Sequence, residues 1–145
     1  MRRLFTILYT ISGFCVLAQE TIWIRRLGLE IGNTVISATI VVTAFFLCAA
    51  LGNLYGSKLL QNSRKPLRIY GLSEVATGLS AMLLFPLAGS FYIFLHPMVN
   101  TLPVTWPIHL LYAILLVGPP AFCAGISFPA LSEAFIDKVD HRATA

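Results

Sequence analysis

Four long apolar segments, each able to cross a lipid bilayer as a helix, constrain the fold of this chain more than any other feature. They cover about 4–24, 34–60, 69–95 and 106–135. A hydrocarbon core about 30 Å thick needs roughly 20 helical residues, so each segment is long enough to span it. Charged residues make up 11% of the chain, whereas a soluble domain carries about 25%. The sequence therefore predicts an integral membrane protein with four spans.

The segments are continuous apolar runs rather than alternating apolar and polar residues, which favours helices over a membrane β-barrel. We expect an all-α fold in which 1–145 form one transmembrane helical domain, ending in a polar tail at 136–145. Prolines interrupt the third and fourth segments at Pro86, Pro119, Pro120 and Pro129. Each removes a backbone donor that lipid cannot replace, so we expect kinks that face protein or water.

Basic residues are distributed unequally between the two ends of these segments. Eight lie at the end that holds both termini and the loop between the second and third segments: Arg2, Arg3, Lys58, Arg64, Lys65, Arg68, Lys138 and Arg142. Only Arg25 and Arg26 lie at the opposite end. The positive-inside rule places both termini and the basic loop in the cytoplasm, as in a multi-pass protein of a bacterial inner membrane. The net charge of +4 reflects this topology and contact with the lipid bilayer, and does not indicate a nucleic-acid partner.

The second segment carries a stripe of small residues at every fourth position: Ala44, Cys48, Gly52 and Gly56. This spacing puts them on one face of a helix, and Gly52 and Gly56 form a GxxxG motif that lets two helix backbones approach closely. Two hypotheses stay open for this helix-packing seam. It packs within the chain, or it contacts a protein partner or a second copy.

A carboxylate, Glu74, lies about two turns inside the third segment, on the same helix face as Ser73 and Thr77. Charged groups at that depth usually pair or face a cavity. We expect a structural contact with the basic loop formed by Lys58, Arg64, Lys65 and Arg68, with transport or proton relay as the alternative role.

A second polar group, Glu20, Trp23 and Arg25, marks the end of the first segment. We interpret it as a membrane exit with a structural contact, in which Trp23 lies at interfacial depth and the arginine reaches the headgroups. A binding site is the secondary interpretation.

No pattern in the sequence predicts a catalytic centre. Cysteines and histidines are scattered along the chain: Cys15, Cys48, Cys123, His96, His109 and His141. Their spacing predicts neither a disulfide framework nor a metal site. There is also no nucleophile–base pair and no glycine-rich phosphate loop. We therefore expect no catalytic, metal-binding or cofactor-binding residue.

Several groups of residues, in chain order, resemble one known family. They are Glu20-x-x-Trp23-x-Arg25, the run 44–59 with its GxxxG motif, Lys65-Pro66-Leu67-Arg68-x-Tyr70-Gly71-Leu72-x-Glu74, and Pro119-Pro120-x-Phe122-x-x-Gly125. Together they resemble the membrane region of the spermidine synthase-like membrane proteins. That resemblance implies a helical membrane region preceding a cytoplasmic domain similar to polyamine aminopropyltransferases, which use a decarboxylated S-adenosylmethionine-type donor. These 145 residues contain no soluble βαβ pattern, so no catalytic residue of the family carries over.

Three function classes follow from these observations. The leading hypothesis is a non-catalytic membrane module, an anchor or assembly subunit of a membrane complex, that contacts a protein partner or forms a homo-oligomer through helix packing. The first alternative is a small solute or polyamine transporter that acts as an oligomer. The second is a truncated part of an aminopropyltransferase-like membrane enzyme.

Overall fold

The described part of the chain folds into four helices whose ranges contain the four apolar segments. The computed structural model describes residues 2–61, 65–101 and 105–143. The helices are α1 (Arg2–Ile31), α2 (Thr34–Gln61), α3 (Pro66–Thr101) and α4 (Trp106–Ala143). Each contains a stretch long and apolar enough to cross a membrane. The predicted all-α fold with four membrane-spanning helices is therefore confirmed. The residues expected to form a polar tail continue the α4 helix as far as Ala143.

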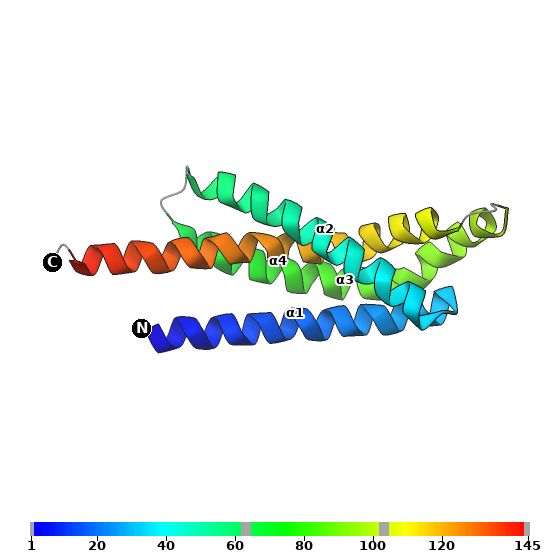
Figure 1. Ribbon diagram of the computed structural model, residues 1–145, viewed down its shortest axis with the longest axis horizontal. Helices are drawn as coiled ribbons and strands as arrows, with labels where there is room; N and C mark the ends of the chain where they lie inside the picture. The colour runs from blue at the N-terminus through cyan, green and yellow to red at the C-terminus, as the bar shows by residue number, and fades with distance from the viewer. Residues whose placement is uncertain (1, 62–64, 102–104, 144–145) are drawn as a thin grey trace.

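Two residues reverse the chain between α1 and α2. Gly32 has a φ of 76°, and its N–H donates to the carbonyl of Gly28 at 3.1 Å. A glycine in this left-handed conformation commonly closes a helix. Asn33 then caps α2, because its Oδ1 accepts hydrogen bonds from the N–H groups of Val35 at 3.0 Å and Ile36 at 3.1 Å. α1 and α2 are consequently antiparallel neighbours (Figure 1).

The bundle is elongated, and both chain termini lie at the same end of it (Figure 1). We call this the terminal end and the other the far end. α4 is the central helix: its contact with α2 is the most extensive in the bundle, and its contact with α3 is second. α1 runs along one side and packs mainly on α2, with little contact to α3. α1 is therefore the least embedded helix of the four.

α2 and α4 approach each other closely enough for backbone to touch backbone. A Cβ atom added at Gly52 would collide with the carbonyl oxygen of Phe122, and one added at Gly125 would collide with the carbonyl oxygen of Ala49. A Cβ at Gly56 would lie 3.1 Å from the α4 backbone at Ile126. Only glycine permits this separation, and close approach is what favours helix association in lipid.

The prolines inside the helices have different environments. Pro120 is buried, and Pro129 lies beside Gly56 of α2, so these two turns face protein as expected. Pro86 and Pro119 are exposed. Pro86 and Pro97 both lie inside α3, and this helix changes direction in the half that contains them (Figure 1).

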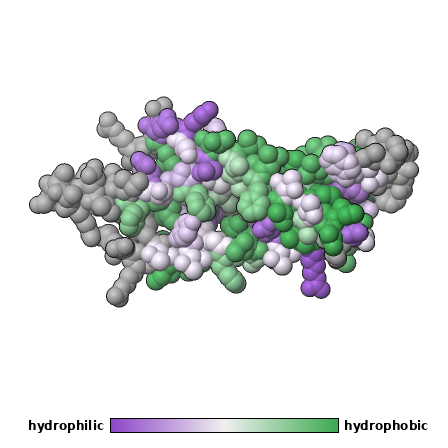
Figure 2. All heavy atoms as spheres, viewed as in Figure 1, coloured by the Kyte–Doolittle hydropathy of each residue, from purple (hydrophilic) through white to green (hydrophobic). Residues whose placement is uncertain are grey.

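Two clusters of buried residues form the core. The larger lies toward the far end: Trp23, Leu27, Ile40, Val41, Ala44, Ala88, Tyr112, Ala113, Leu116 and Val117. The smaller lies at the terminal end: Leu60, Tyr70, Ala130 and Leu131. Between them, large apolar side chains of α1 and α3 face outward, among them Phe14 (73% exposed) and Met82 (77% exposed). Figure 2 shows that most of the middle of one face is hydrophobic. Apolar surface on this scale fits a lipid environment.

We expect Gly52→Ala to destabilise the bundle, because the added Cβ meets the Phe122 carbonyl, a backbone atom that cannot rotate away. Overpacking of a tight contact costs about 1–3 kcal/mol. The measurement is the midpoint of thermal unfolding of the purified protein in mild detergent, which should fall. Gly78→Ala is the matched control, because a Cβ there meets nothing within 4 Å and alanine favours a helix more than glycine does. Equal midpoints for the two variants would contradict the close α2–α4 contact.

Candidate functional site

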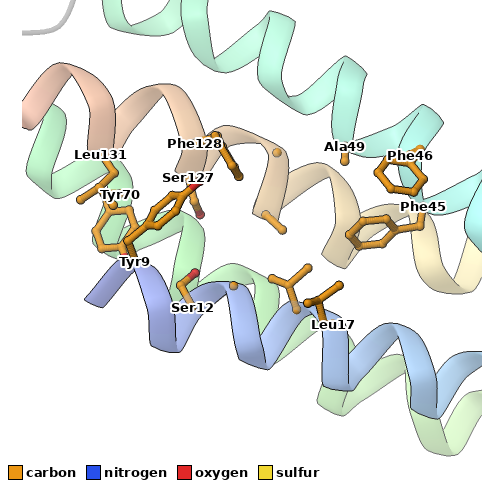
Figure 3. Close-up of a pocket in the computed structure, with 14 residues that line it drawn as sticks. Tyr9, Ser12, Leu17, Phe45, Phe46, Ala49, Tyr70, Ser127, Phe128 and Leu131 are labelled. Atoms are coloured by element: carbon orange, nitrogen blue, oxygen red, sulfur yellow. The ribbon is translucent and has the colours of Figure 1, made fainter. Parts of the chain in front are cut away.

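A cavity of about 330 Å³ lies between the first half of α1 and the paired helices α2 and α4 (Figure 3). Small residues face one another across it: Gly13 on α1, Ala49 on α2, and Ala124 and Gly125 on α4. A Cβ at Gly13 would meet nothing within 4 Å. The space is left open where these small residues face one another.

Aromatic rings dominate the rest of the cavity wall. They come from all four helices: Tyr9, Phe45, Phe46, Tyr70 and Phe128. Tyr9 and Phe128 make an edge-to-face contact with ring centroids 5.4 Å apart, which joins α1 to α4 at the terminal end. In Figure 3 the rings of Phe45 and Phe46 lie on the α2 side, toward the other end of the cavity. A mostly apolar wall with a few polar groups is typical of small-molecule sites.

The polar groups of the cavity lie toward its terminal end. Ser12 lines the cavity, and its hydroxyl donates to Oε1 of Glu74 at 2.7 Å, which links α1 to α3. The Ser73 hydroxyl donates to the carbonyl of Tyr70 at 2.8 Å. The Ser73 and Ser127 hydroxyls lie 2.9 Å apart and share a hydrogen bond that joins α3 to α4.

The structure places Glu74 beside the cavity. Among the described residues, Glu74 makes no ion pair, and its hydrogen bond goes to Ser12. Three residues of the basic loop, Lys58, Lys65 and Arg68, are exposed at the terminal end of the bundle. The fourth, Arg64, lies outside the described residues. The three described bases are thus on the surface, and the side-chain hydrogen bond of Glu74 goes to a hydroxyl of α1.

The small-residue stripe of α2 lies against α4. Ala44, Cys48, Gly52 and Gly56 are all buried, and a Cβ at Gly118 of α4 would lie 3.1 Å from the Cys48 sulfur. Of the two hypotheses for this seam, the geometry matches packing within the chain. A second molecule would have to displace α4 in order to reach these residues.

The far end of the bundle contains an ion pair that the sequence analysis missed. Arg26 Nη2 lies 3.1 Å from Glu30 Oε1, and the Glu30 side chain is only 9% exposed. The hydroxyl of Tyr112 lies 2.6 Å from Glu30 Oε2 and 2.8 Å from the carbonyl of Ala88. One hydroxyl proton therefore has two acceptors. The Tyr92 hydroxyl donates to the Glu30 carbonyl at 2.7 Å, so α1 is tied to both α3 and α4 here.

The spacing of four residues between Arg26 and Glu30 was the available signal for this pair, because i and i+4 residues face each other on a helix. Two buried atoms, Arg26 Nε and Glu30 Oε1, make no hydrogen bond within the described part of the chain. Oε1 is therefore compensated by the charge of the nearby guanidinium and not by a directional bond. A buried charge compensated in this way depends strongly on its remaining partners.

The residues predicted at the end of the first segment separate in the structure. Trp23 is 1% exposed and contacts the edge of Phe85 with centroids 5.6 Å apart, so it belongs to the core and not to an interface with headgroups. Arg25 is exposed. Glu20 is half-buried and makes no hydrogen bond or ion pair to a described residue. Val16 lies on the α1 wall of the cavity, and Glu20 lies one helical turn beyond it, outside the lining.

Nothing in the described chain brings together three of the side chains that hold metal ions, namely histidine, cysteine, aspartate and glutamate. Cys15, Cys48 and Cys123 are free thiols at separate positions. The apolar, aromatic cavity has a carboxylate, Glu74, at one edge, and this arrangement is suited to binding a small molecule.

We expect Tyr112→Phe to lower the stability of the folded protein by about 1–2 kcal/mol, because it removes a hydrogen bond to a buried carboxylate without changing the ring. The measurement is the free energy of unfolding in mixed detergent micelles. Tyr55→Phe is the control, because Tyr55 is 54% exposed and keeps its ring contact with Phe122 after the change. A loss of the same size in both variants would show that the Glu30 contact contributes nothing specific.

Comparison of the chain with protein-family models finds no match. Neither the curated proteins nor the solved structures compared with it show a significant similarity. The function therefore has to be argued from the helices and the cavity themselves.

Proposed function

We propose that the chain is a non-catalytic membrane module, an anchor or subunit, that holds a small amphipathic molecule in the cavity along α1. The observation that carries this proposal is the cavity of about 330 Å³ between α1 and the α2–α4 pair. Its volume falls within the range of roughly 300–1,000 Å³ that is usual for ligand sites.

The attachment of α1 supports a binding role. At the far end, Trp23 and Leu27 are buried in the larger core cluster, and Glu30 bonds to Tyr112. At the terminal end, α1 is held by the Ser12–Glu74 hydrogen bond and the contact between Tyr9 and Phe128. The segment between these two attachments lies against the cavity. α1 is thus fixed at both ends and leaves room for a ligand in between.

The proposal assigns no partner contact to the small-residue stripe of α2, because α4 covers it. An assembly role would use other surfaces, and the apolar faces of α1 and α3 are the ones left exposed. Both termini are cytoplasmic in this proposal. The cytoplasmic location of the termini is supported by the positive-inside rule. Three exposed basic residues, Lys58, Lys65 and Arg68, lie where α2 ends and α3 begins, whereas the exposed Arg25 lies in the second half of α1.

We expect Gly13→Leu to abolish ligand binding, because Gly13 lines the cavity, a Cβ there meets nothing within 4 Å, and the rest of the leucine side chain would occupy the space left for a ligand. The probe is a neutral phenyldiazirine, used for photolabelling of the protein in lipid nanodiscs and read out by mass spectrometry. Labelling of Phe45 and Tyr70, the two cavity rings least exposed to lipid, should be saturable in the wild type and lost in Gly13→Leu.

Gly78→Leu makes the same substitution at another open position, which does not line the cavity, so it should keep the saturable labelling. Lipid-facing Leu72, which is 72% exposed, should be labelled without saturation in every variant. Unsaturable labelling throughout the wild-type protein would show that the cavity is not a ligand site.

The proposed orientation is tested with reporter fusions in a bacterial host. Because eight basic residues lie at one end of the segments and two at the other, we expect a C-terminal fluorescent-protein fusion to fluoresce and a C-terminal alkaline-phosphatase fusion to be inactive. Fusions made after Asn33 should give the reverse result, because that point lies at the far end. The opposite pattern would place the termini outside.

A further inference from the structure

Two carboxylates lie near the cavity, and no basic side chain is among the residues that line it. None of the residues that line it is charged. The nearest ionisable acids are Glu74, which bonds to the lining residue Ser12, and Glu20, one turn beyond the α1 wall. Among the described residues neither carboxylate has a cationic partner. A charged group in a membrane usually pairs or faces a cavity. The cavity is therefore electrically suited to a positive charge.

The wall supplies a second attraction for cations. Tyr9, Phe45, Phe46, Tyr70 and Phe128 line it, and the face of an aromatic ring carries partial negative charge that attracts an ammonium group. Tyr70 is also close enough to Glu74 and Ser12 to interact with both. Rings and carboxylate thus lie together at the terminal end of the cavity.

The same wall supplies too few oxygen ligands for a divalent metal ion. Ca²⁺ takes roughly six to eight oxygen ligands and Mg²⁺ about six. The side-chain oxygens that line this cavity are the four hydroxyls of Tyr9, Ser12, Tyr70 and Ser127, and Ser127 already bonds to Ser73. Most of the wall is apolar, so a ligand there must itself carry apolar groups.

We propose that the cavity binds a lipophilic organic cation, an ammonium group bearing apolar substituents, with Glu74 as its counter-charge. This inference rests on the proposed function, since it names the class of ligand for that cavity. The apolar substituents occupy the space between Gly13 and the aromatic rings of α2. The ammonium lies toward the terminal end, near Ser12 and Glu74.

The experiment compares two competitors of the same shape, benzyltrimethylammonium and its uncharged carbon analogue neopentylbenzene, in the photolabelling assay in nanodiscs. The readout is the concentration of each that halves labelling of Phe45 and Tyr70. In Glu74→Gln, we expect benzyltrimethylammonium to compete about tenfold more weakly than in the wild type, which corresponds to about 1.4 kcal/mol, while neopentylbenzene is unaffected. The amide still accepts the Ser12 hydrogen bond, so the fold should be retained.

Two further variants separate charge from structure. Glu74→Asp keeps the negative charge and should retain most of the cation competition. Glu133→Gln removes an exposed carboxylate of α4 that does not line the cavity, and should behave as wild type.

Equal effects of Glu74→Gln on both competitors would overturn the assignment of the counter-charge. If neopentylbenzene competes but benzyltrimethylammonium does not, the cavity takes apolar molecules or lipid chains, and the cation inference fails while the binding function stands. If neither competes and labelling is unsaturable, both proposals fail.

Discussion

The backbone contact between α2 and α4 sets where every other element lies. Apolar side chains gain little by leaving lipid for one another, so helices in a membrane associate where they approach closely enough for dispersion and polar contacts. Gly52 on Phe122 and Gly125 on Ala49 provide such an approach from both helices. α4 becomes the central helix as a result, with α3 on its other side and α1 packed mainly on α2. The small residues that bring α2 and α4 together also leave space opposite Gly13 of α1. This space is the cavity.

Polar contacts then hold α1, which has the least buried surface of the four helices. At the far end Glu30 is bonded to Tyr112, and its backbone carbonyl to Tyr92. At the terminal end Ser12 is bonded to Glu74. Such hydrogen bonds contribute about 1 kcal/mol each in membrane proteins. They therefore fix the orientation of α1, and each adds only a small share of the stability of the bundle. The middle of α1 is the part with the fewest attachments, and it lies beside the cavity.

The features predictable from the sequence were those encoded locally. Continuous apolar runs predicted four helices, which the structure confirms, and the four-residue spacing from Ala44 to Gly56 placed those residues on one face. Contacts between distant residues were not accessible. Ser12 and Glu74 are 62 positions apart, and Glu30 and Tyr112 are 82 apart, so only the assembled bundle brings them together. Trp23 was expected at the headgroups because tryptophan favours interfaces, but α1 continues to Ile31 and the ring lies in the core.

Glu30 and Glu74, which both lie at helix contacts, differ in how completely the described part of the chain compensates their charge. Glu30 has a guanidinium at 3.1 Å and a hydroxyl at 2.6 Å, the latter from Tyr112 of the larger core cluster, and it is not among the residues that line the cavity along α1. Glu74 has one hydroxyl among the described residues and lies beside an aromatic-lined space. A carboxylate with a guanidinium partner in its own chain fixes a structure, whereas one left with a single neutral partner in a membrane favours the arrival of a positive group. The far end of α1 is therefore built as a structural attachment, and the terminal end has the incomplete electrostatics expected of a binding site.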